Sequence, residues 1–534
     1  MKFNKTSKIV LSVSLVGWII LALIIIDTSS INAKNDTDSV DIYKKIKLFN
    51  EVLFKLQENY VSDLEIEKLI DSAISGMLEE TDPHTNFFDT DEFDRFSTST
   101  KGEFGGLGIS IDKKGKYITV VSPIEGTPAY RMGIQSGDKI VSVDGESVVG
   151  MSTDEAIKKM RGDKGTKVVI GISRPGIKEE LEFEIIRDII KIKSVPYAFK
   201  FDNGVGYVRI RQFNANTTEE LREKLDELEE EGIKGLLIDL RFNPGGLLKE
   251  AINTVNEFIG KGKRVVFTKG RSPQTNMEYY TRYNRMRSGY PIIVMINEAS
   301  ASAAEIFAGS LQDWDRGLVV GKTSFGKGSV QRLFPLSDGN GIKITTAKYY
   351  INSGRCIHKD INDRILKGED ISDADIELAD EEHLEDVHYT ENGRIVYGGG
   401  GINPDIEIEQ SKLTSLGMEL RRKNLFFNYT VDYMIENDDK VDLDFQADDQ
   451  MVENLIEFAK KDSIEFEQAE LDSTYNWIQN EITWNVINRK YGNEEGYKIL
   501  IKEDTQLQEA LKLFDKCPTL EEMFSYLKTL IIEE

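Results

Sequence analysis

Two almost wholly apolar runs constrain the fold of this chain more than any other feature: IKGLLIDL at 233–240 and PIIVMIN at 291–297. Each run has the length of a strand and shows no alternation of apolar and polar residues, so such a strand must be buried on both faces. Segments with helical spacing of apolar residues lie before the first run, at 217–232, and between the two, at 249–260. Doubly buried strands that alternate with helices predict a largely parallel sheet with both faces covered.

The first of these helices has a recognisable start and a recognisable inner face. Thr217 and Glu220 have the spacing of a capping box, in which each side chain satisfies the backbone amide of the other residue. Leu221, Leu225 and Leu228 recur at helical spacing and predict the face that packs on the sheet.

A second pattern fills residues 103–190. The loop GGLGISI leads into a strand, KYITVV and GDKIVSVDG continue a small sheet, a helix follows with an S-x-x-E capping box, and two strands close the unit. This order of elements resembles a PDZ domain. The resemblance implies a groove beside a sheet edge that accepts an extended peptide as an added strand. It also implies that the amides of Leu107, Gly108 and Ile109 capture the terminal carboxylate of that peptide.

The N-terminus carries an uncharged run from Ile9 to Ile26, which three lysines precede. As a helix, this run would be about 27 Å long, near the thickness of a bilayer core. The lysines predict that the N-terminus stays in the cytoplasm, which would anchor the chain in the inner membrane and place the rest of it in the periplasm or extracytoplasmic space. Cleavage near Ala33 is an alternative that would release the protein into the same compartment.

Composition excludes several classes of partner and cofactor. The net charge of −25 argues against binding to nucleic acid or to anionic membrane surfaces. The two cysteines, Cys356 and Cys517, are too few for a disulfide framework. The four histidines fall into no metal-binding pattern, because His383 and His388 are five residues apart and would not share a helix face. We therefore expect no metal and no cofactor.

Three short segments carry the candidate chemistry. NEASASAAEIF places Ser300 and Ser302 after an apolar strand and at the start of a predicted helix, where α/β sites form and helix amides lack partners. GKTSFGKGSVQ places Lys327 between two glycines, and DLRFNPGGLL ends an apolar strand in a Pro-Gly-Gly turn with amides suited to an oxyanion hole. For the first segment alone, small residues that permit close helix packing are the alternative explanation.

Six motifs in one order resemble those of the carboxyl-terminal processing (tail-specific) peptidases. They are GGLGI, GYVRIRQF, DLRFNPGG, ASASAAEIFAGSLQD, VVGKTSFGKGSVQ and GGGGINPDI, and they extend over about 80–408. The resemblance implies a serine peptidase that reads the C-terminal tails of protein substrates and cleaves with a Ser–Lys dyad. The fold class that it implies is multidomain α/β and α+β, with a crotonase-like αβ protease core, an inserted PDZ domain and an extra C-terminal helical region.

The resemblance also assigns roles to residues of this chain. Ser302, the second serine of the S-A-S-A box, is similar to the family's nucleophile, and Ser300 would shape the turn. Lys327 is similar to the general base, which must be neutral to accept the Ser302 proton, so we expect burial to lower its pKa. Gln331 is similar to the side chain that positions this lysine.

Two further roles follow from the same resemblance. The amide of Ala303, together with that of Gly245 or Gly246, would hold the oxyanion of the tetrahedral intermediate. Asp313 matches an acidic position of some relatives, and we expect its role to be structural.

Other activities fit the sequence less well. The main alternative is a catalytically inactive PDZ adaptor that binds C-terminal tails. GKTSFGK at 321–327 satisfies the pattern of a phosphate-binding loop, but Gly328 replaces the residue that would hold Mg²⁺, and SVQRLFPL is a predicted strand where a helix should begin. Cys356 and His358 are disfavoured as a thiol site because no third group orients them.

The regions expected outside the core do not determine the oligomeric state or the protein partners. The acidic segment 367–394 is an insertion that would change access to the site, and the helix-like region after 409 would serve packing, dimerisation or guidance of substrates. A homodimer and an adaptor lipoprotein both remain possible partners. The expected regions are an N-terminal anchor and linker (1–38), an N-terminal helical region (39–102), the PDZ domain (103–190), the protease core (191–409) and a C-terminal helical region (410–534).

Overall fold

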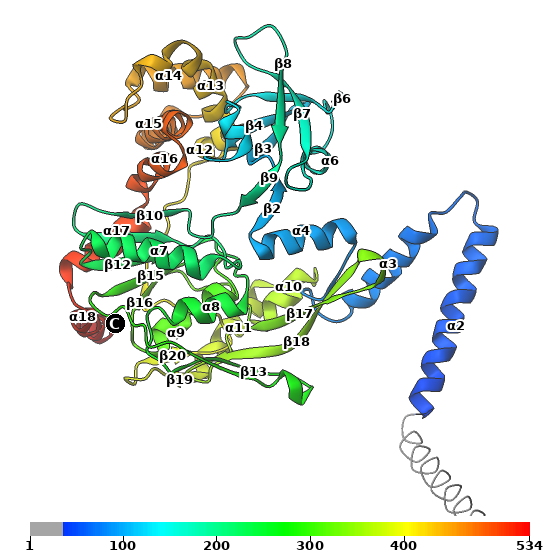
Figure 1. Cartoon of the computed structure of the whole chain (residues 1–534). Coiled ribbons are helices and arrows are strands. Elements are labelled where there is room, and N and C mark those ends of the chain that lie inside the picture. The colour runs from blue at the N-terminus through cyan, green and yellow to red at the C-terminus, as the bar shows by residue number, and fades with distance from the viewer. Residues whose placement is uncertain (1–35, 534) are drawn as a thin grey trace, which may run out of the picture. The chain divides into compact units, whose positions relative to one another are not determined.

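The computed structural model describes residues 36–533, and the membrane-spanning segment predicted at 9–26 lies outside this range. The chain divides into two compact units at Glu80 (Figure 1). The described part of the first unit contains α2 (Asp36–Asn59) and α3 (Ile66–Glu79), as the helical spacing of its apolar residues predicts. Within residues 36–533, no helix is long and apolar enough to cross a bilayer.

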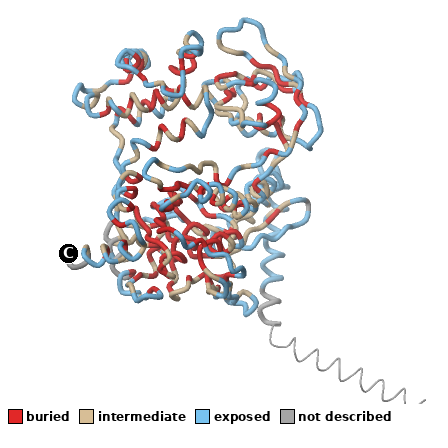
Figure 2. The backbone as a smooth tube through the Cα atoms, turned by 60° about the vertical axis from the view of Figure 1, so that its left-hand side comes forward, coloured by how far each residue is buried: buried red, intermediate tan, exposed pale blue. Residues whose placement is uncertain are grey.

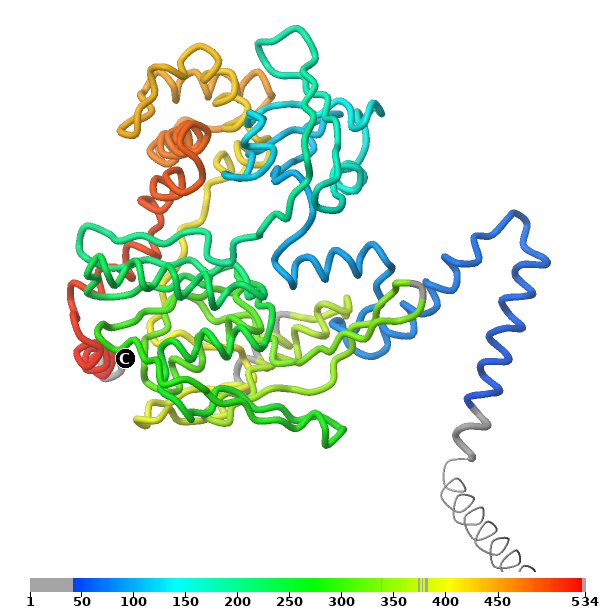
Figure 3. Tube along the Cα trace, in the orientation of Figure 1, coloured from blue at the N-terminus to red at the C-terminus, as the bar shows by residue number. Residues whose placement is uncertain are grey.

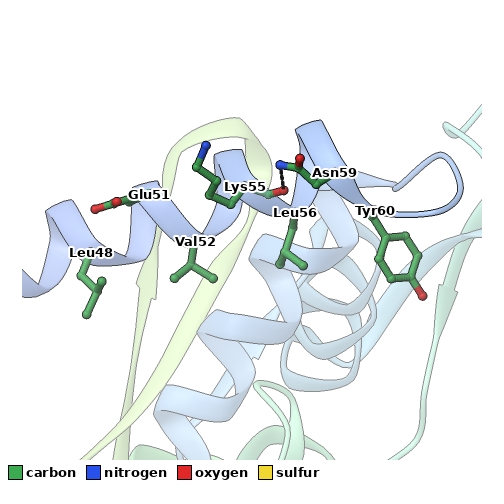
Figure 4. A pocket seen from close by; sticks show the side chains of 7 residues that line it. All are labelled: Leu48, Glu51, Val52, Lys55, Leu56, Asn59 and Tyr60. Atoms are coloured by element: carbon green, nitrogen blue, oxygen red, sulfur yellow. Dashed lines mark hydrogen bonds between the residues drawn. The ribbon is translucent and has the colours of Figure 1, made fainter.

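Helix α2 has a well-defined apolar side. Leu48, Val52, Leu56 and Tyr60 project from this side in Figure 4, whereas Lys55 projects away from it. The helical spacing of these side chains explains why the segment forms a helix.

The main sheet of the second unit has the strand order β10-β11-β12-β15-β16-β21. Its strands are β10 (Tyr197–Lys200), β11 (Val205–Arg209), β12 (Gly235–Asp239), β15 (Ile292–Ile296), β16 (Leu318–Gly321) and β21 (Ile406–Glu407). All neighbours from β11 to β21 are parallel, and only β10 runs antiparallel to its neighbour. The prediction of a largely parallel sheet around two doubly buried strands is confirmed.

Helices cover one face of this sheet in the order in which they occur in the chain. They are α7 (Thr217–Glu230), α8 (Leu248–Val255) and α9 (Ala303–Asp313). The three leucines predicted to face the sheet from α7 are buried in one core with residues of β12 and β15. Figure 2 shows many buried residues (red) at the height where Figure 1 labels these helices and strands.

The predicted capping box at the start of α7 is wrong. The N-cap residue is Asn216, and no side chain caps the helix there. The Glu220 carboxylate instead accepts hydrogen bonds from the backbone amides of Ser194, at 2.7 Å, and Val195, at 2.9 Å. A tertiary contact therefore replaces the local one, and it ties the chain that enters the core to the helix.

The opposite face of the main sheet is covered by the end of the chain. Helices α17 (Thr505–Lys516) and α18 (Leu520–Glu533) share a core with β11, β12, β15 and β16. The ring of Phe514 packs on Gly235, where a Cβ atom would lie 2.5 Å from the ring. In Figure 3 this last segment (red) lies beside the strands from the middle of the chain (green).

A second sheet holds the residues that flank the candidate base. It has the order β1-β18-β13-β14, with β17 paired to β18. Its strands are β1 (Asn86–Phe88), β13 (Arg264–Lys269), β14 (Glu278–Tyr280), β17 (Ser329–Pro335) and β18 (Gly341–Ile351). The strand predicted at 329–336 is therefore confirmed, and β18 brings residues near 86 next to those near 343.

The PDZ-like unit is a small sheet with the order β3-β4-β5-β7-β8 and a main helix, α6 (Thr153–Met160), which starts with the predicted capping box. Its strands are β3 (Ile109–Lys114), β4 (Tyr117–Pro123), β5 (Lys139–Val143), β6 (Glu146–Ser147), β7 (Lys167–Ser173) and β8 (Leu181–Ile186), and α5 (Pro128–Arg131) precedes β5. Strands β2 (Glu103–Gly106) and β9 (Asp188–Lys191) pair where the chain enters and leaves the unit, after α4 (Thr90–Lys101).

The helices after residue 409 belong to two cores. One set packs on itself, and it comprises α12 (Ser415–Arg422), α13 (Leu425–Asn437), α14 (Asp449–Lys461), α15 (Gln468–Tyr491) and α16 (Asn493–Leu500). This set contacts the PDZ-like unit, where the Arg489 guanidinium donates to the Ser136 carbonyl and the Lys114 ammonium lies 3.2 Å from the centre of the Phe427 ring. The acidic segment before it forms α11 (Asp373–Glu385) and the hairpin β19 (Val387–Tyr389) with β20 (Ile395–Tyr397), after α10 (Asp360–Leu366).

Candidate active site

Ser302 lies at the turn between β15 and α9, beyond the carboxyl end of a central strand. Its backbone has φ +55° and ψ −111°, a strained conformation for a residue with a side chain. Helix α9 begins at the next residue, Ala303. The structure therefore places this hydroxyl at a helix N-terminus, as the sequence predicts.

Ser300 is held inside the turn. It is fully buried, its hydroxyl donates to the Leu240 carbonyl at 2.9 Å, and it accepts from the Asn297 amide at 2.9 Å. These bonds fasten the end of β15 to the end of β12. The contacts agree with the turn-shaping role expected for this serine.

Glu305 connects the candidate nucleophile to the candidate base. Its Oε2 atom accepts from the amides of Ser302, at 2.6 Å, and Lys327, at 3.0 Å. Its Oε1 atom accepts from the Ser324 hydroxyl at 2.5 Å and the Gly326 amide at 2.6 Å. Burial raises the pKa of this carboxyl, and the four hydrogen bonds oppose that effect. Glu305 was not predicted as a site residue, although the S-x-x-E spacing after Ser302 is a usable signal.

Tyr349 makes a second connection between the same two segments. Its hydroxyl lies 2.6 Å from the Lys327 carbonyl and 3.1 Å from the Ser302 carbonyl. Burial raises the pKa of Tyr349 well above its ordinary value, so the phenol stays protonated and can donate. No local pattern indicated this residue, which is on β18.

Lys327 is in the loop before β17, between two glycines that pack closely on the segment 357–359. A Cβ atom at Gly326 would lie 2.7 Å from that of Lys359, and one at Gly328 would lie 2.7 Å from the His358 amide nitrogen. Burial lowers the pKa of Lys327, and the carboxylates of Glu305, Asp363 and Asp82 oppose this shift. Within the described residues, no hydrogen bond joins the Lys327 amine to the Ser302 hydroxyl, so their contact remains a prediction.

Gln331 is on β17, four residues after Lys327. Its amide nitrogen donates to the hydroxyls of Ser329, at 2.9 Å, and Thr345, at 3.3 Å. Both amide hydrogens are therefore used, and the side-chain carbonyl oxygen is the group left for other contacts.

The two glycines proposed for the oxyanion hole differ in whether their backbone amides are already hydrogen-bonded. The Gly245 amide donates to the Asn243 side chain at 2.8 Å, so it is already engaged. Gly245 instead permits close packing, since a Cβ atom there would lie 2.7 Å from that of Ser302. The amides of Gly246 and Ala303 donate to no other group within residues 36–533. Of the two alternatives, Gly246 is the one that remains a candidate.

The other residues singled out from the sequence have partners outside this centre. Asp313 is buried at the far end of α9, where it accepts from the Arg355 guanidinium at 2.9 Å and the Ser353 amide at 2.7 Å. These contacts agree with a structural role. Burial raises the pKa of the Cys356 thiol, and the Nδ1 atom of His358 accepts from the Gly328 amide. Within the described residues, no cluster of His, Cys, Asp or Glu could hold a metal ion.

The PDZ-like unit presents an apolar groove along its edge strand β3. The groove is lined by Phe104, Gly106, Leu107, Gly108, Ile109, Ile111, Ile157, Met160 and Arg161. The carbonyls of Leu107 and Gly108 accept hydrogen bonds from the chain behind them, whereas their amides have no partner among residues 36–533. The loop is fixed, because Gly108 has φ +79° and a Cβ atom there would lie 2.3 Å from Thr127. The groove therefore offers unpaired amides next to apolar side chains.

Comparison with known families gives three matches. Residues 204–366 match peptidase family S41, residues 119–174 match a PDZ domain, and residues 417–492 match a family of unknown function, DUF8443. The first match covers strands β11, β12, β15 and β16 of the main sheet together with the serine turn, and the second covers the middle of the PDZ-like unit, from β4 to β7.

Individual relatives agree with these matches. A carboxy-terminal-processing protease of Bartonella bacilliformis is 39% identical over 345 residues, which are 64% of this chain and 78% of that protein. The carboxy-terminal processing protease CtpA of Bacillus subtilis is 32% identical over 407 residues, which are 76% of this chain and 84% of that protein. Among solved structures, the photosystem II D1 C-terminal processing protease is 29% identical, covers 58% of this chain and 90% of its own, and has a TM-score of 0.34.

Proposed function

We propose a function from one premise: this chain belongs to the carboxy-terminal processing proteases of peptidase family S41. It is a serine-type peptidase with a PDZ domain. Our proposal is that Ser302 is its nucleophile and Lys327 its general base. The observation that carries the proposal is the Glu305 carboxylate, which holds the amides of both residues on one oxygen atom.

The mechanism follows from these positions. The neutral Lys327 amine takes the proton of the Ser302 hydroxyl, whose oxygen attacks the scissile carbonyl. The amides of Ala303 and Gly246 hold the oxyanion, and the N-terminus of α9 adds a favourable dipole. The Lys327 ammonium then protonates the leaving amine, and the same amine later activates the water that hydrolyses the acyl-enzyme.

Substrate choice would come from the PDZ groove. An extended C-terminal tail adds to the edge strand β3, its carboxylate binds the amides of Leu107 and Gly108, and its last side chain enters the apolar groove between β3 and α6. The groove favours a tail that ends in an apolar residue. The run at 9–26 would anchor the enzyme in the inner membrane with its catalytic part outside.

We expect the full-length protein to cleave an unfolded polypeptide with a free, apolar C-terminus at least about tenfold more efficiently, by kcat/KM, than the same chain with an amidated C-terminus. Ile157→Asp puts a charge into the groove and should erase this preference by raising KM. Ile177→Asp is the matched control, because Ile177 is 42% exposed in a loop of the same domain and does not line the groove. Binding of tails without cleavage would instead support the inactive adaptor.

Glu305→Gln should lower kcat by about a hundredfold and destabilise the fold by about 1–3 kcal/mol. An amide nitrogen in place of one carboxylate oxygen would face two donors and leave them without an acceptor. Steady-state kinetics and thermal unfolding check the two effects. Glu298→Gln, seven residues earlier at an exposed position, is the control and should change neither. Normal kcat in Glu305→Gln would show that the carboxylate does not organise the dyad.

A further inference from the structure

The segment 81–88, TDPHTNFF, interrupts the helical pattern of the sequence and has no role in the mechanism above. Asp82 organises it as a turn: its Oδ1 atom accepts from the His84 amide at 2.9 Å, and its Oδ2 atom accepts from the Thr85 hydroxyl at 2.8 Å. The segment then continues into β1, which pairs with β18. It lies outside the part of the chain that matches the peptidase family.

Two hydrogen bonds fasten this turn to Thr345 on β18. The Thr345 amide donates to the Thr85 hydroxyl at 3.1 Å, and the Thr345 hydroxyl donates to Oδ1 of Asp82 at 3.0 Å. Thr85 is buried, with 4% of its surface exposed. The position of the Asp82 carboxylate relative to β18 is therefore fixed.

The same threonine determines the orientation of the Gln331 amide. The single hydrogen of the Thr345 hydroxyl is used by Asp82, so this oxygen can only accept from Gln331. With Ser329 taking the other amide hydrogen, the nitrogen of Gln331 faces β18 and its carbonyl oxygen is left free. A chain of hydrogen bonds thus runs from Asp82 through Thr345 to Gln331.

A second set of contacts leads from the turn to Gly328, the residue after Lys327. The imidazole of His84 lies 3.2 Å from Asp363, and the imidazole of His358 lies 3.2 Å from the other oxygen of that carboxylate. Burial raises the pKa of Asp363, but its two imidazole neighbours oppose this effect and bring the pKa below its ordinary value. His358 in turn accepts from the amide of Gly328, next to Lys327.

We propose that Asp82 is a positioning residue for the general base: through Thr345 it orients the Gln331 amide so that its carbonyl oxygen, and not its nitrogen, is presented to the Lys327 amine. The proposal rests on the proposed function, in which Lys327 is that base. A carbonyl oxygen accepts an N–H of the neutral amine and leaves the amine's lone pair for the Ser302 proton. A reversed amide would donate to that lone pair and block it.

Asp82 also acts on Lys327 through its charge. The charged groups around the lysine are Glu305 on α9, Asp363 on α10, Asp82 on the turn and Lys343 on β18, with His84 and His358 on either side of Asp363. Asp82 favours the protonated lysine. Removing its charge should therefore lower the Lys327 pKa and move the acid limb of the kcat/KM profile to lower pH.

Thr345→Val and Thr345→Ser test the hydrogen-bond chain in the full-length protein. Thr345→Val keeps the branched shape but removes the hydroxyl, and we expect about a tenfold lower kcat with little change in KM, a part of what general-base catalysis supplies. Thr345→Ser retains the hydroxyl and should keep most of the activity. Thermal unfolding is measured for both, so that a folding defect is not read as a catalytic one. Equal kcat in the two variants would overturn the proposal.

Asp82→Asn tests the charge, because an asparagine oxygen can still accept from Thr345. We expect its acid limb to move to lower pH, and an unchanged profile would count against the proposal. Asp89→Asn is the control: it makes the same change at an exposed N-cap seven residues later and should leave the profile unaltered. Suppose that Thr345→Val and Asp82→Asn behave as the wild-type protein does, and that the wild-type protein and Asp89→Asn cleave normally. In that case only the positioning role of Asp82 is refuted. A wild-type protein without Ser302-dependent cleavage would overturn the proposed function as well.

Discussion

Ser302→Ala is expected to lower the rate of proteolysis at least about a thousandfold, while leaving the fold intact. The Ser302 hydroxyl is on a strained turn at the carboxyl end of β15. The candidate oxyanion-hole amides, those of Gly246 and Ala303, have no partner among the described residues. Without the hydroxyl, no acyl-enzyme can form, and only the binding and oxyanion contributions to the rate remain. Cleavage of an unfolded polypeptide, followed as loss of intact chain, measures this loss.

Ser300→Ala is the matched control, since it makes the same change two residues earlier. Its hydroxyl joins the ends of β12 and β15 in the buried interior, so removing it should cost about 1–3 kcal/mol of folding stability. Catalysis by the molecules that remain folded should be retained. The opposite result, a stable but inactive Ser300→Ala and an active Ser302→Ala, would exchange the roles of the two serines.

The main sheet is predictable from the sequence because its information is local. A strand buried on both faces is expected to be largely apolar, and the consecutive residues of β12 and β15 show this pattern. The cover of the second face is not predictable in this way, since the contact of Phe514 with Gly235 joins residues far apart in the chain. The capping box of α7 failed for a related reason: Glu220 has better partners in a distant segment.

The residues of the candidate site also fall into two groups: some belong to local sequence motifs, and others are brought together only by the fold. Ser302 and Lys327 stand in recognisable motifs, and Glu305 follows the serine at a spacing that the sequence displays. Tyr349 and Asp82 reach the site only through the register of β18 with its neighbours, which no local pattern gives. The sequence also could not show which glycine amide is available for the oxyanion hole. The structure favours Gly246 over Gly245, because the Gly245 amide donates to the Asn243 side chain.

Lys327→Met should reduce proteolysis by about three orders of magnitude at every pH. Methionine has nearly the same length and fits an apolar environment, so the fold should tolerate it. Lys327→Arg should be equally inactive, because a guanidinium does not release its proton and cannot serve as a base.

For the wild-type protein, kcat/KM should rise with pH through the Lys327 pKa, since only the deprotonated amine accepts the serine proton. Burial places that pKa below the ordinary value of 10.5, and the pH profile of the wild-type protein measures it.

Lys322→Met separates this effect from a general loss of positive charge near the site. Lys322 is five residues earlier, and the hydrogen bonds that its ammonium donates to Glu407 and Glu409 raise its pKa to about 12, so it is not available as a base. Its replacement should leave both the rate and the acid limb of the profile unchanged. Retained proteolysis in Lys327→Met, or an acid limb that does not depend on this residue, would mean that another group takes the proton of Ser302. Such a result would leave the tail-reading groove in place but remove the dyad from the mechanism.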